Sequence, residues 1–325
     1  MNKIAVIIPC YNEEKTIKKV INDVRSALPG SVIYVYDNNS SDKTYEIAAG
    51  AGAIVRRETK QGKGRVVRTA FREIDAMCYL LVDGDDTYSL ENAHEMCDLV
   101  LQNKVDMVIG DRLSGSYFIE NKRRFHNNGN RAVRSFINFL FGSDIRDVMS
   151  GLRVMSYRFV KSFPIISKGF EIETEMTIHA VDKDLYIENV AVAYRDRPDG
   201  SLSKLNTFSD GFKVLKTIIK LYKNYRPLSF FTIIAFLFFI CAGLLLIPIM
   251  VTYWQTGLVP KFPTLIVCGF AAITGIQSFF GGLVLDTMVQ KHKQDFEIKL
   301  TELASPQNKH GKKSAVILKK RVNQG

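Results

Sequence analysis

The chain has 325 residues, 46% of them apolar, and its 44 Lys and Arg against 33 Asp and Glu give a net charge of +11. So many aliphatic and aromatic side chains can form a sizeable core, which excludes intrinsic disorder. The charge is uneven, because residues 1–207 carry a net +1 and residues 208–325 a net +10. The stretches 227–260 and 262–285 contain no charged residue and are long enough to cross a bilayer, which excludes a purely soluble protein.

From residue 3 to about residue 192, short β-branched runs alternate with amphipathic helical patterns, which is typical of a mostly parallel sheet covered by helices. The first elements predicted are strand 4–9, helix 14–28, strand 32–36, helix 43–51, strand 53–56, helix 64–74 and strand 78–82. The run 4–8 is too short for the apolar region of a signal peptide. Ligands of such α/β sheets bind beyond the carboxyl ends of the strands, so residues 11–13, 37–42 and 83–87 should line one cleft.

After residue 207 the pattern changes. Apolar and basic side chains recur at helical spacing over 208–226, which indicates a helix lying on an anionic membrane surface; a helix packed on the soluble domain is the alternative. Two transmembrane helices are predicted at about 228–251 and 264–285. Because the short connection between them holds a single Lys, we expect it outside and both chain ends in the cytoplasm. The expected division is a cytoplasmic α/β domain 1–207, a juxtamembrane helix 208–226, a transmembrane pair 227–289 and a basic tail 290–325.

Polar side chains with distinct chemistry follow the predicted strands. Asp83 and Asp85 are separated by one glycine, and two such carboxylates can hold a divalent cation whose other ligands are water and phosphate oxygens. A nucleoside diphosphate leaving group needs that cation, since negative charge accumulates on it as its bond to a sugar breaks. Asp37 can accept a hydrogen bond from a uracil or guanine ring. Lys63, between two glycines at a helix start, suits phosphate.

No Walker GxxxxGK[ST] string and no GxGxxG fingerprint occurs. The motifs instead resemble, in family order, those of family 2 glycosyltransferases of the GT-A fold, in the polyprenyl-phosphate branch similar to dolichol-phosphate mannose synthase. The matching strings are 9–13 (PCYNE), 37–42 (DNNSSD), 62–64 (GKG), 83–85 (DGD), 110–112 (GDR), 150–153 (SGLR) and Arg197 with 200–205 (GSLSKL). The resemblance covers about 3–226, and the two spans are similar to those of bacterial members that use undecaprenyl phosphate.

The resemblance implies a role for each matching residue. The nucleotide-sugar pocket would comprise Pro9, Tyr11, Glu13, Asp37, Lys63 and Asp83, and Asp83 with Asp85 would hold Mg²⁺ or Mn²⁺. The acceptor phosphate would meet Arg112, Arg124, Arg197 and Lys204, with Arg123 and Arg131 as alternatives to Arg124. Two departures from the family pattern stand out: Asp86-Thr87 replaces Leu-Gln, which leaves a third metal ligand unassigned, and Asn38-Asn39 replaces Asp-Gly.

The implied reaction moves one sugar, with inversion, from a nucleoside diphosphate sugar, expected to be a UDP-sugar, to undecaprenyl or dolichyl phosphate at the cytoplasmic membrane face. A phosphate monoester with a second pKa of about 6 is already ionised at neutral pH, so we expect no essential general base. The expected partners are the nucleotide sugar, the lipid phosphate, the membrane and a possible second copy of the chain, but no nucleic acid.

Two other functions stay open. A transferase acting on a glycolipid or glycan hydroxyl would need a base and usually a larger set of spans. A membrane-anchored nucleotide-sugar-binding protein without turnover would account for the two departures. The role of Glu171, Glu173 and Glu175 is also open, between lining a cleft and lying on an exposed strand or turn.

Overall fold

The computed structural model describes residues 2–112, 114, 134–139, 141–195, 216 and 219–304. The chain divides into two compact units, Met1–Thr217 and Ile218–Gly325. The expected boundary after residue 207 falls in a stretch outside the described residues. Each unit is considered by itself.

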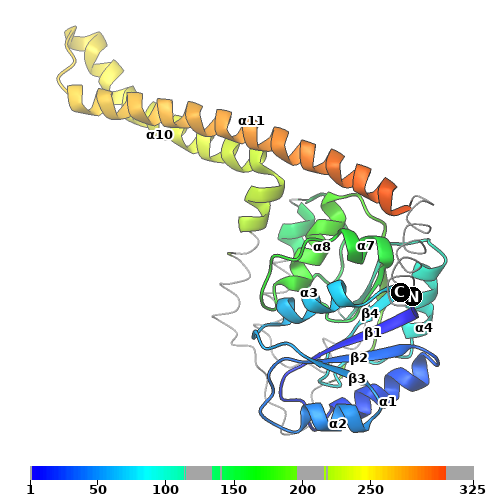
Figure 1. Ribbon diagram of the computed structural model, residues 1–325. Helices are drawn as coiled ribbons and strands as arrows, with labels where there is room; N and C mark the ends of the chain where they lie inside the picture. The colour runs from blue at the N-terminus through cyan, green and yellow to red at the C-terminus, as the bar shows by residue number, and fades with distance from the viewer. Residues whose placement is uncertain are drawn as a thin grey trace, which may run out of the picture. The chain divides into compact units, whose positions relative to one another are not determined.

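The first unit is built on a seven-stranded sheet with the order β3-β2-β1-β4-β6-β5-β7 (Figure 1). Its strands are β1 (Asn2–Cys10), β2 (Val32–Asp37), β3 (Ile54–Arg57), β4 (Ala76–Leu81), β5 (Met107–Asp111), β6 (Arg153–Ser156) and β7 (Ile187–Ala191). In this sheet β6 runs antiparallel to β4 and β5, and the other neighbours pair in parallel. The predicted mostly parallel sheet is therefore confirmed.

Helices cover both faces of the sheet, as predicted (Figure 1). They are α1 (Ile17–Ala27), α2 (Thr44–Gly50), α3 (Lys63–Glu73), α4 (Ala93–Leu101), α7 (Tyr157–Ser162) and α8 (Ile172–Asp182). The helix predicted from residue 14 begins only at Ile17. The reason is that the backbone N–H groups of Glu13 and Glu14 bond to Thr44 Oγ1 and an Asp42 carboxylate oxygen, at 2.8 and 3.1 Å, and so belong to the preceding turn.

Two-residue alternation along the strands supplies a core on each face. Val6, Ile8 and Leu80 belong to one apolar cluster with the buried side chains of α1, α2 and α4. Tyr79, which precedes Leu80 on β4, points to the opposite face of the sheet. It packs on Phe71 of α3, with ring centroids 6.2 Å apart. The sheet is thus buried on both faces. This packing holds its strands in place and so positions the polar loops that follow them.

The second unit is a pair of long apolar helices, α10 (Pro227–Thr256) and α11 (Phe262–Ala304), which pack side by side (Figure 1). Both are long and apolar enough to cross a membrane. A Cβ added at Gly282 would lie 2.9 Å from Phe231 Cβ, and one at Gly275 would lie 3.2 Å from the Ala235 carbonyl oxygen. The two backbones therefore approach each other closely at glycine.

Helix α11 is longer than the predicted span 264–285. It continues without interruption to Ala304, because residues 286–304 contain neither glycine nor proline and are rich in Lys, Gln and Glu, which favour helix. Of the predicted juxtamembrane helix 208–226, residues 216 and 219–225 are helical, and Arg226 is a bend before α10; residues 208–215, 217 and 218 lie outside the described residues.

Candidate active site

The loops that follow β1, β2 and β4 meet at one edge of the sheet. Cys10, at the end of β1, is level with Asp37 at the end of β2, and its carbonyl accepts the Asn38 N–H at 2.8 Å. The Thr16 hydroxyl donates to the Gly84 carbonyl at 2.7 Å, which ties the start of α1 to the turn after β4. The predicted convergence of the three loops is therefore present.

The residues expected at the nucleotide pocket lie on these loops. Pro9 is the penultimate residue of β1, and Tyr11 follows it with 38% of its surface exposed. Glu13 and Asp37 are both buried. The backbone N–H of Ser40 donates to Asp37 Oδ1 at 3.3 Å, so this carboxylate also shapes its own loop.

Asn38, one of the two departures from the family pattern, connects two of these loops. Its amide nitrogen donates to the carbonyls of Glu58 and Lys60, both at 2.9 Å. Its amide oxygen accepts the Gly62 N–H at 2.7 Å. An aspartate could make only the last of these bonds, because a carboxylate cannot donate when ionised. Asn38 therefore positions the segment that starts α3.

The glycines on both sides of Lys63 allow a second loop to approach. A Cβ at Gly62 would lie 2.1 Å from the Lys168 carbonyl oxygen, and one at Gly64 would lie 2.4 Å from the Ser167 carbonyl oxygen. Gly62 also has φ = 133°, which a residue with a side chain rarely adopts. The close packing of the two loops therefore requires glycine on both sides of Lys63.

Lys63 directs its ammonium group to two carboxylates. Its Nζ forms ion pairs with Asp83 Oδ1 and, at 2.5 Å, with Glu173 Oε1. Burial alone would lower the pKa of Lys63, but the two carboxylates outweigh it and raise the pKa. Burial raises the pKa of Glu173, which the lysine partly offsets. The three groups form one charge cluster after β4, in which Lys63 and Glu173 are buried and Asp83 is partly exposed.

Glu173 lies in the first turn of α8 and is 4% exposed. Glu175, also buried, accepts the backbone N–H groups of Ile166 and Ser167 at 3.1 and 2.8 Å. Of the two placements left open by the sequence, an exposed strand or turn is wrong for Glu173 and Glu175, whereas Glu171 lies half-buried in the turn before α8. Apolar Ile172 and Met176 recur at helical spacing, which is the signal that could have identified the helix.

Asp85 and Asp86 differ although they are neighbours. Asp85 is buried, and its Oδ1 accepts the Thr87 hydroxyl at 2.7 Å. Asp86 has φ = 59° and pairs with Lys19 at 2.6 Å. In the described part of the chain no group of three or more His, Cys, Asp and Glu side chains is arranged around a metal position. The donor set Asp83 and Asp85 fits a hard cation that takes its remaining ligands from water and phosphate.

Gly151, in the SGLR string, leaves room for Asp83. A Cβ there would lie 2.2 Å from Asp83 Oδ2 and 3.2 Å from Lys63 Nζ. The Gly151 N–H donates to the Tyr88 hydroxyl at 2.7 Å. The loop with the SGLR string therefore packs directly against the carboxylate of Asp83, which follows β4.

Arg153 fixes the same loop from inside the protein. Its guanidinium is fully buried and donates to the carbonyls of Ser150 and Val148 and to the Thr177 hydroxyl, at 2.9, 2.7 and 2.9 Å. Burial lowers its pKa to about 10. Arg153 is thus a structural residue rather than a ligand-binding one.

Arg112, expected at the acceptor phosphate, is buried and paired. Its Nε and Nη2 donate to the two Asp147 carboxylate oxygens at 2.7 and 3.0 Å. The guanidinium lies 5.4 and 5.9 Å from the ring centres of Tyr194 and Tyr88. Burial alone would lower the pKa of Arg112, but Asp147 outweighs it and raises the pKa. No sequence pattern identified Asp147 as the partner of Arg112.

A short antiparallel bridge joins Tyr88 to Tyr194, whose rings meet edge to face at 5.2 Å. The Arg195 N–H donates to the Thr87 carbonyl at 2.8 Å. The turn after β4 is therefore paired with the segment that follows β7. Three of the expected acceptor-site residues lie outside the described residues: Arg124, Arg197 and Lys204.

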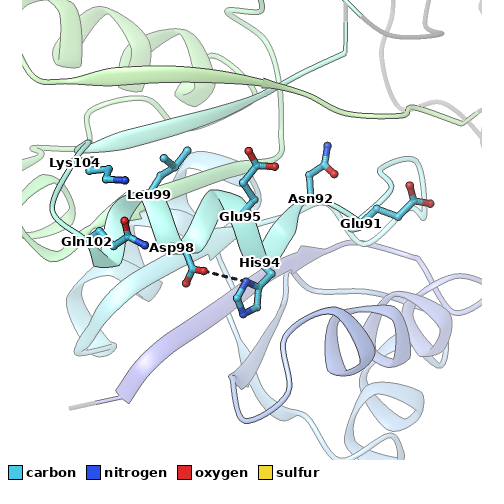
Figure 2. A pocket seen from close by; sticks show the side chains of 8 residues that line it. All are labelled: Glu91, Asn92, His94, Glu95, Asp98, Leu99, Gln102 and Lys104. Carbon is cyan, nitrogen blue, oxygen red and sulfur yellow. Dashed lines mark ion pairs between the residues drawn. The ribbon is translucent and has the colours of Figure 1, made fainter.

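A cavity of the described part of the first unit lies elsewhere (Figure 2). It measures about 450 Å³ and lies along α4, between Glu91 and Lys104. His94 and Asp98, one helical turn apart on α4, pair at 3.1 Å beside it, as Figure 2 shows. None of the residues expected at the active site lines this cavity.

Comparison with known proteins agrees with this geometry. Residues 5–163 match the model of glycosyl transferase family 2. Glycosyltransferase AglJ of Haloferax volcanii is 30% identical over 90% of this chain and 96% of its own length. A dolichyl-phosphate hexose transferase of the same organism is 30% identical over 67% of this chain and 92% of its own length.

A solved structure matches the first unit in fold. Glucosyl-3-phosphoglycerate synthase from Mycobacterium tuberculosis, crystallised with UDP, superposes with a TM-score of 0.57 at 20% identity, over 68% of this chain and 80% of that one. The same enzyme crystallised with Mn²⁺, UDP-glucose and phosphoglyceric acid gives a TM-score of 0.54. The chain thus has the GT-A fold and belongs to glycosyltransferase family 2.

Proposed function

We propose that this enzyme transfers a sugar from a UDP-sugar to a polyprenyl phosphate at the cytoplasmic face of a membrane, with inversion at the anomeric carbon. The observation that carries the proposal is the bridge between Tyr88 and Tyr194. It joins the turn with the two aspartates to the chain that leads into Arg197. A donor diphosphate and an acceptor phosphate could therefore be bound side by side.

On the donor side, Pro9, Tyr11, Glu13 and Asp37 would form the nucleotide pocket. Asp37 ends β2 level with Cys10, so a uracil ring held there would lie at the same sheet edge as the two aspartates. Lys63 would face the diphosphate. The crystallised UDP and UDP-glucose complexes of the structural neighbour support a uridine donor.

Asp83 and Asp85 would hold Mg²⁺ or Mn²⁺, which would stabilise the negative charge that accumulates on the leaving diphosphate. The neighbour crystallised with Mn²⁺ supports this assignment. The Thr87 hydroxyl orients Asp85, and the absent side chain of Gly151 leaves space for Asp83.

On the acceptor side, Arg197 follows Arg195 by two residues, which span at most about 7 Å. The Arg195 N–H bonds to the Thr87 carbonyl, which supports a role for Arg197 at the acceptor phosphate. Arg124 and Lys204 would complete the phosphate site with Arg112, whose guanidinium Asp147 already orients. Guanidinium groups suit a dianionic phosphate, since they bind it bidentately and keep their charge.

The second unit would keep the enzyme at the bilayer. Helices α10 and α11 would cross the membrane with their connection outside, and both chain ends would be cytoplasmic. The dolichyl-phosphate hexose transferase among the relatives supports a lipid phosphate acceptor. Such an acceptor is already ionised, so the enzyme needs to position it rather than to remove a proton.

The test is transfer by the purified full-length protein. Labelled UDP-sugars are incubated with undecaprenyl phosphate and Mn²⁺, and label is followed into an organic-extractable lipid that mild acid cleaves. Asp85→Ala should lower transfer at least about 1,000-fold, because loss of the metal removes a transition-state contact of about 4 kcal/mol. The matched control is Asp86→Asn, which keeps the left-handed backbone and should retain activity.

The acceptor assignment has its own measurement. Arg197→Ala should raise the KM for lipid phosphate more than the KM for the nucleotide sugar. An acid-stable product on a hydroxyl acceptor would instead favour a glycolipid or glycan transferase. Donor binding with no transfer to any acceptor would favour the non-catalytic function.

A further inference from the structure

The ammonium group of Lys63 forms ion pairs with two carboxylates in the candidate site. In the described part of the chain, Lys63 forms ion pairs with Asp83 and with Glu173. The two partners differ in exposure: the Asp83 side chain is 27% exposed and that of Glu173 6%. Asp83 is thus the outer partner, reached by ligands, and Glu173 the inner one.

The inner members of the cluster, Lys63 and Glu173, have little freedom to rearrange. Glu173 is carried by α8, and Lys63 is the first residue of α3. On the side of Gly151, backbone lies so close that a single added carbon would overlap Asp83 Oδ2. The Lys63 side chain is 7% exposed, so withdrawal from both carboxylates would leave a buried charge without compensation.

A divalent cation and Lys63 would therefore compete for the same Asp83 carboxylate. Without Glu173, binding of the cation would have to break the ion pair of a buried lysine. With Glu173, the ammonium keeps one strong ion pair when Asp83 turns to the metal, so the exchange costs less.

We propose that Glu173 is a positioning residue that holds Lys63 in place while Asp83 exchanges the lysine for the metal ion. This inference rests on the proposed metal site at Asp83 and Asp85. Glu173 would not touch the metal or the substrate. Its effect would reach the site through Lys63, which it keeps beside the donor diphosphate.

The test measures Mn²⁺ affinity of the full-length protein in detergent, by isothermal titration calorimetry and by electron paramagnetic resonance, without substrate. Glu173→Gln should weaken Mn²⁺ binding about tenfold, because Lys63 would then pair with Asp83 alone and a charge-assisted hydrogen bond would have to be broken. Lys63→Met should tighten binding about tenfold by removing the competitor. Because Glu173 acts only through Lys63, the double variant should bind Mn²⁺ within about threefold of Lys63→Met.

The matched control is Glu175→Gln, because Glu175 is a buried carboxylate of the same helix that bonds to backbone N–H groups instead of Lys63. It should keep the wild-type Mn²⁺ affinity. Wild-type affinity in Glu173→Gln, or weakened binding in Lys63→Met, would overturn the proposal. If Glu173→Gln or Lys63→Met does not fold, the double variant still decides, since it leaves no buried charge unpaired and wild-type affinity in it would overturn the proposal.

Failure of the proposed function gives a different result. In that case the wild-type protein itself would bind no Mn²⁺ at the Asp83 and Asp85 pair, and Asp85→Ala would not change the titration. Wild-type binding that Asp85→Ala removes, together with no effect of Glu173→Gln, would refute only the role of Glu173.

Discussion

The two units place apolar and charged side chains in opposite ways. In the first unit Ile7 and Leu80 are fully buried, whereas Phe236 of α10 and Phe270 of α11 are 63% and 67% exposed within the molecule. Conversely, the first unit buries charged Lys63 and Arg153. The second unit has no charged residue in the spans 227–260 and 262–285. The first unit thus has the interior of a water-soluble enzyme, and the second has the exterior of a membrane protein.

The two units therefore tolerate different kinds of substitution. The first unit depends on complete pairing of its buried charges, because an uncompensated buried ion is costly. The second depends on small residues where its two helices meet, because its packing is set by backbone contact rather than by apolar burial from water. Three predictions test this difference, beginning with the largest expected effect.

The first breaks a buried pair. Arg112→Ala leaves the Asp147 carboxylate, which is 1% exposed, without its bidentate partner. We expect the free energy of unfolding of the full chain to fall by about 3–5 kcal/mol. Chemical denaturation followed by circular dichroism measures it.

The control for that loss is a surface pair. Arg56 pairs with Glu73 at 3.0 Å, and both side chains are more than one-third exposed. Arg56→Ala should change the free energy of unfolding by less than about 1 kcal/mol. Equal losses in Arg56→Ala and Arg112→Ala would show that burial of charge does not distinguish the first unit.

The second prediction adds volume between the helices. Gly282→Val introduces carbon atoms where a Cβ alone would lie 2.9 Å from Phe231 Cβ. We expect the helix pair to lose about 2–3 kcal/mol of stability in SDS titrations, through overpacking.

The neighbouring glycine is the control. A Cβ at Gly281 would meet nothing within 4 Å, so Gly281→Val makes the same change in helix propensity without a clash. It should leave the titration within about 0.5 kcal/mol of the wild type. A similar loss in both variants would contradict close packing at Gly282.

The third and smallest effect is pH dependence in the first unit. His179 packs on Phe159 and Phe163, and burial lowers its pKa to about 4. The unfolded chain therefore binds more protons between pH 6.5 and 4, so the stability that His179 contributes is present above about pH 6.5 and is lost as pH falls through that window. Between pH 7 and 5 the loss is about 2 kcal/mol.

His179→Gln should remove this part of the acid sensitivity, measured as the difference in free energy of unfolding between pH 7 and 5. His94, by contrast, is an exposed residue of α4 paired with Asp98. His94→Gln should keep the wild-type difference. A wild-type difference in His179→Gln would mean that another group causes the acid sensitivity.

Much of the fold followed from local pattern. The strands and helices from β1 to β4 were predicted within a few residues, because apolar alternation and Gly or Pro punctuation mark them directly. The convergence of the loops at Cys10, Asp37 and Asp83 followed from the parallel sheet, since carboxyl ends of parallel strands share an edge.

The partners of the charged groups could not be predicted. Glu173 lies 110 residues after Lys63 in the chain, and Asp147 lies 35 after Arg112, so no local pattern relates them. Asn38 was counted as a departure from a family pattern, yet its amide makes two donor bonds that a carboxylate could not make. Such roles depend on distances between loops, which the sequence does not record.

Because α11 is uninterrupted, any tilt of its apolar part also moves its charged C-terminal part. At 1.5 Å per residue, the stretch beyond the apolar segment, residues 286–304, extends about 28 Å. In a bilayer, helices adjust their tilt to the thickness of the hydrocarbon layer. Because α11 is one continuous helix, a tilt change of about 10° in its apolar part would move its C-terminal end by about 5 Å. A change in membrane thickness would then displace the charged end of the helix.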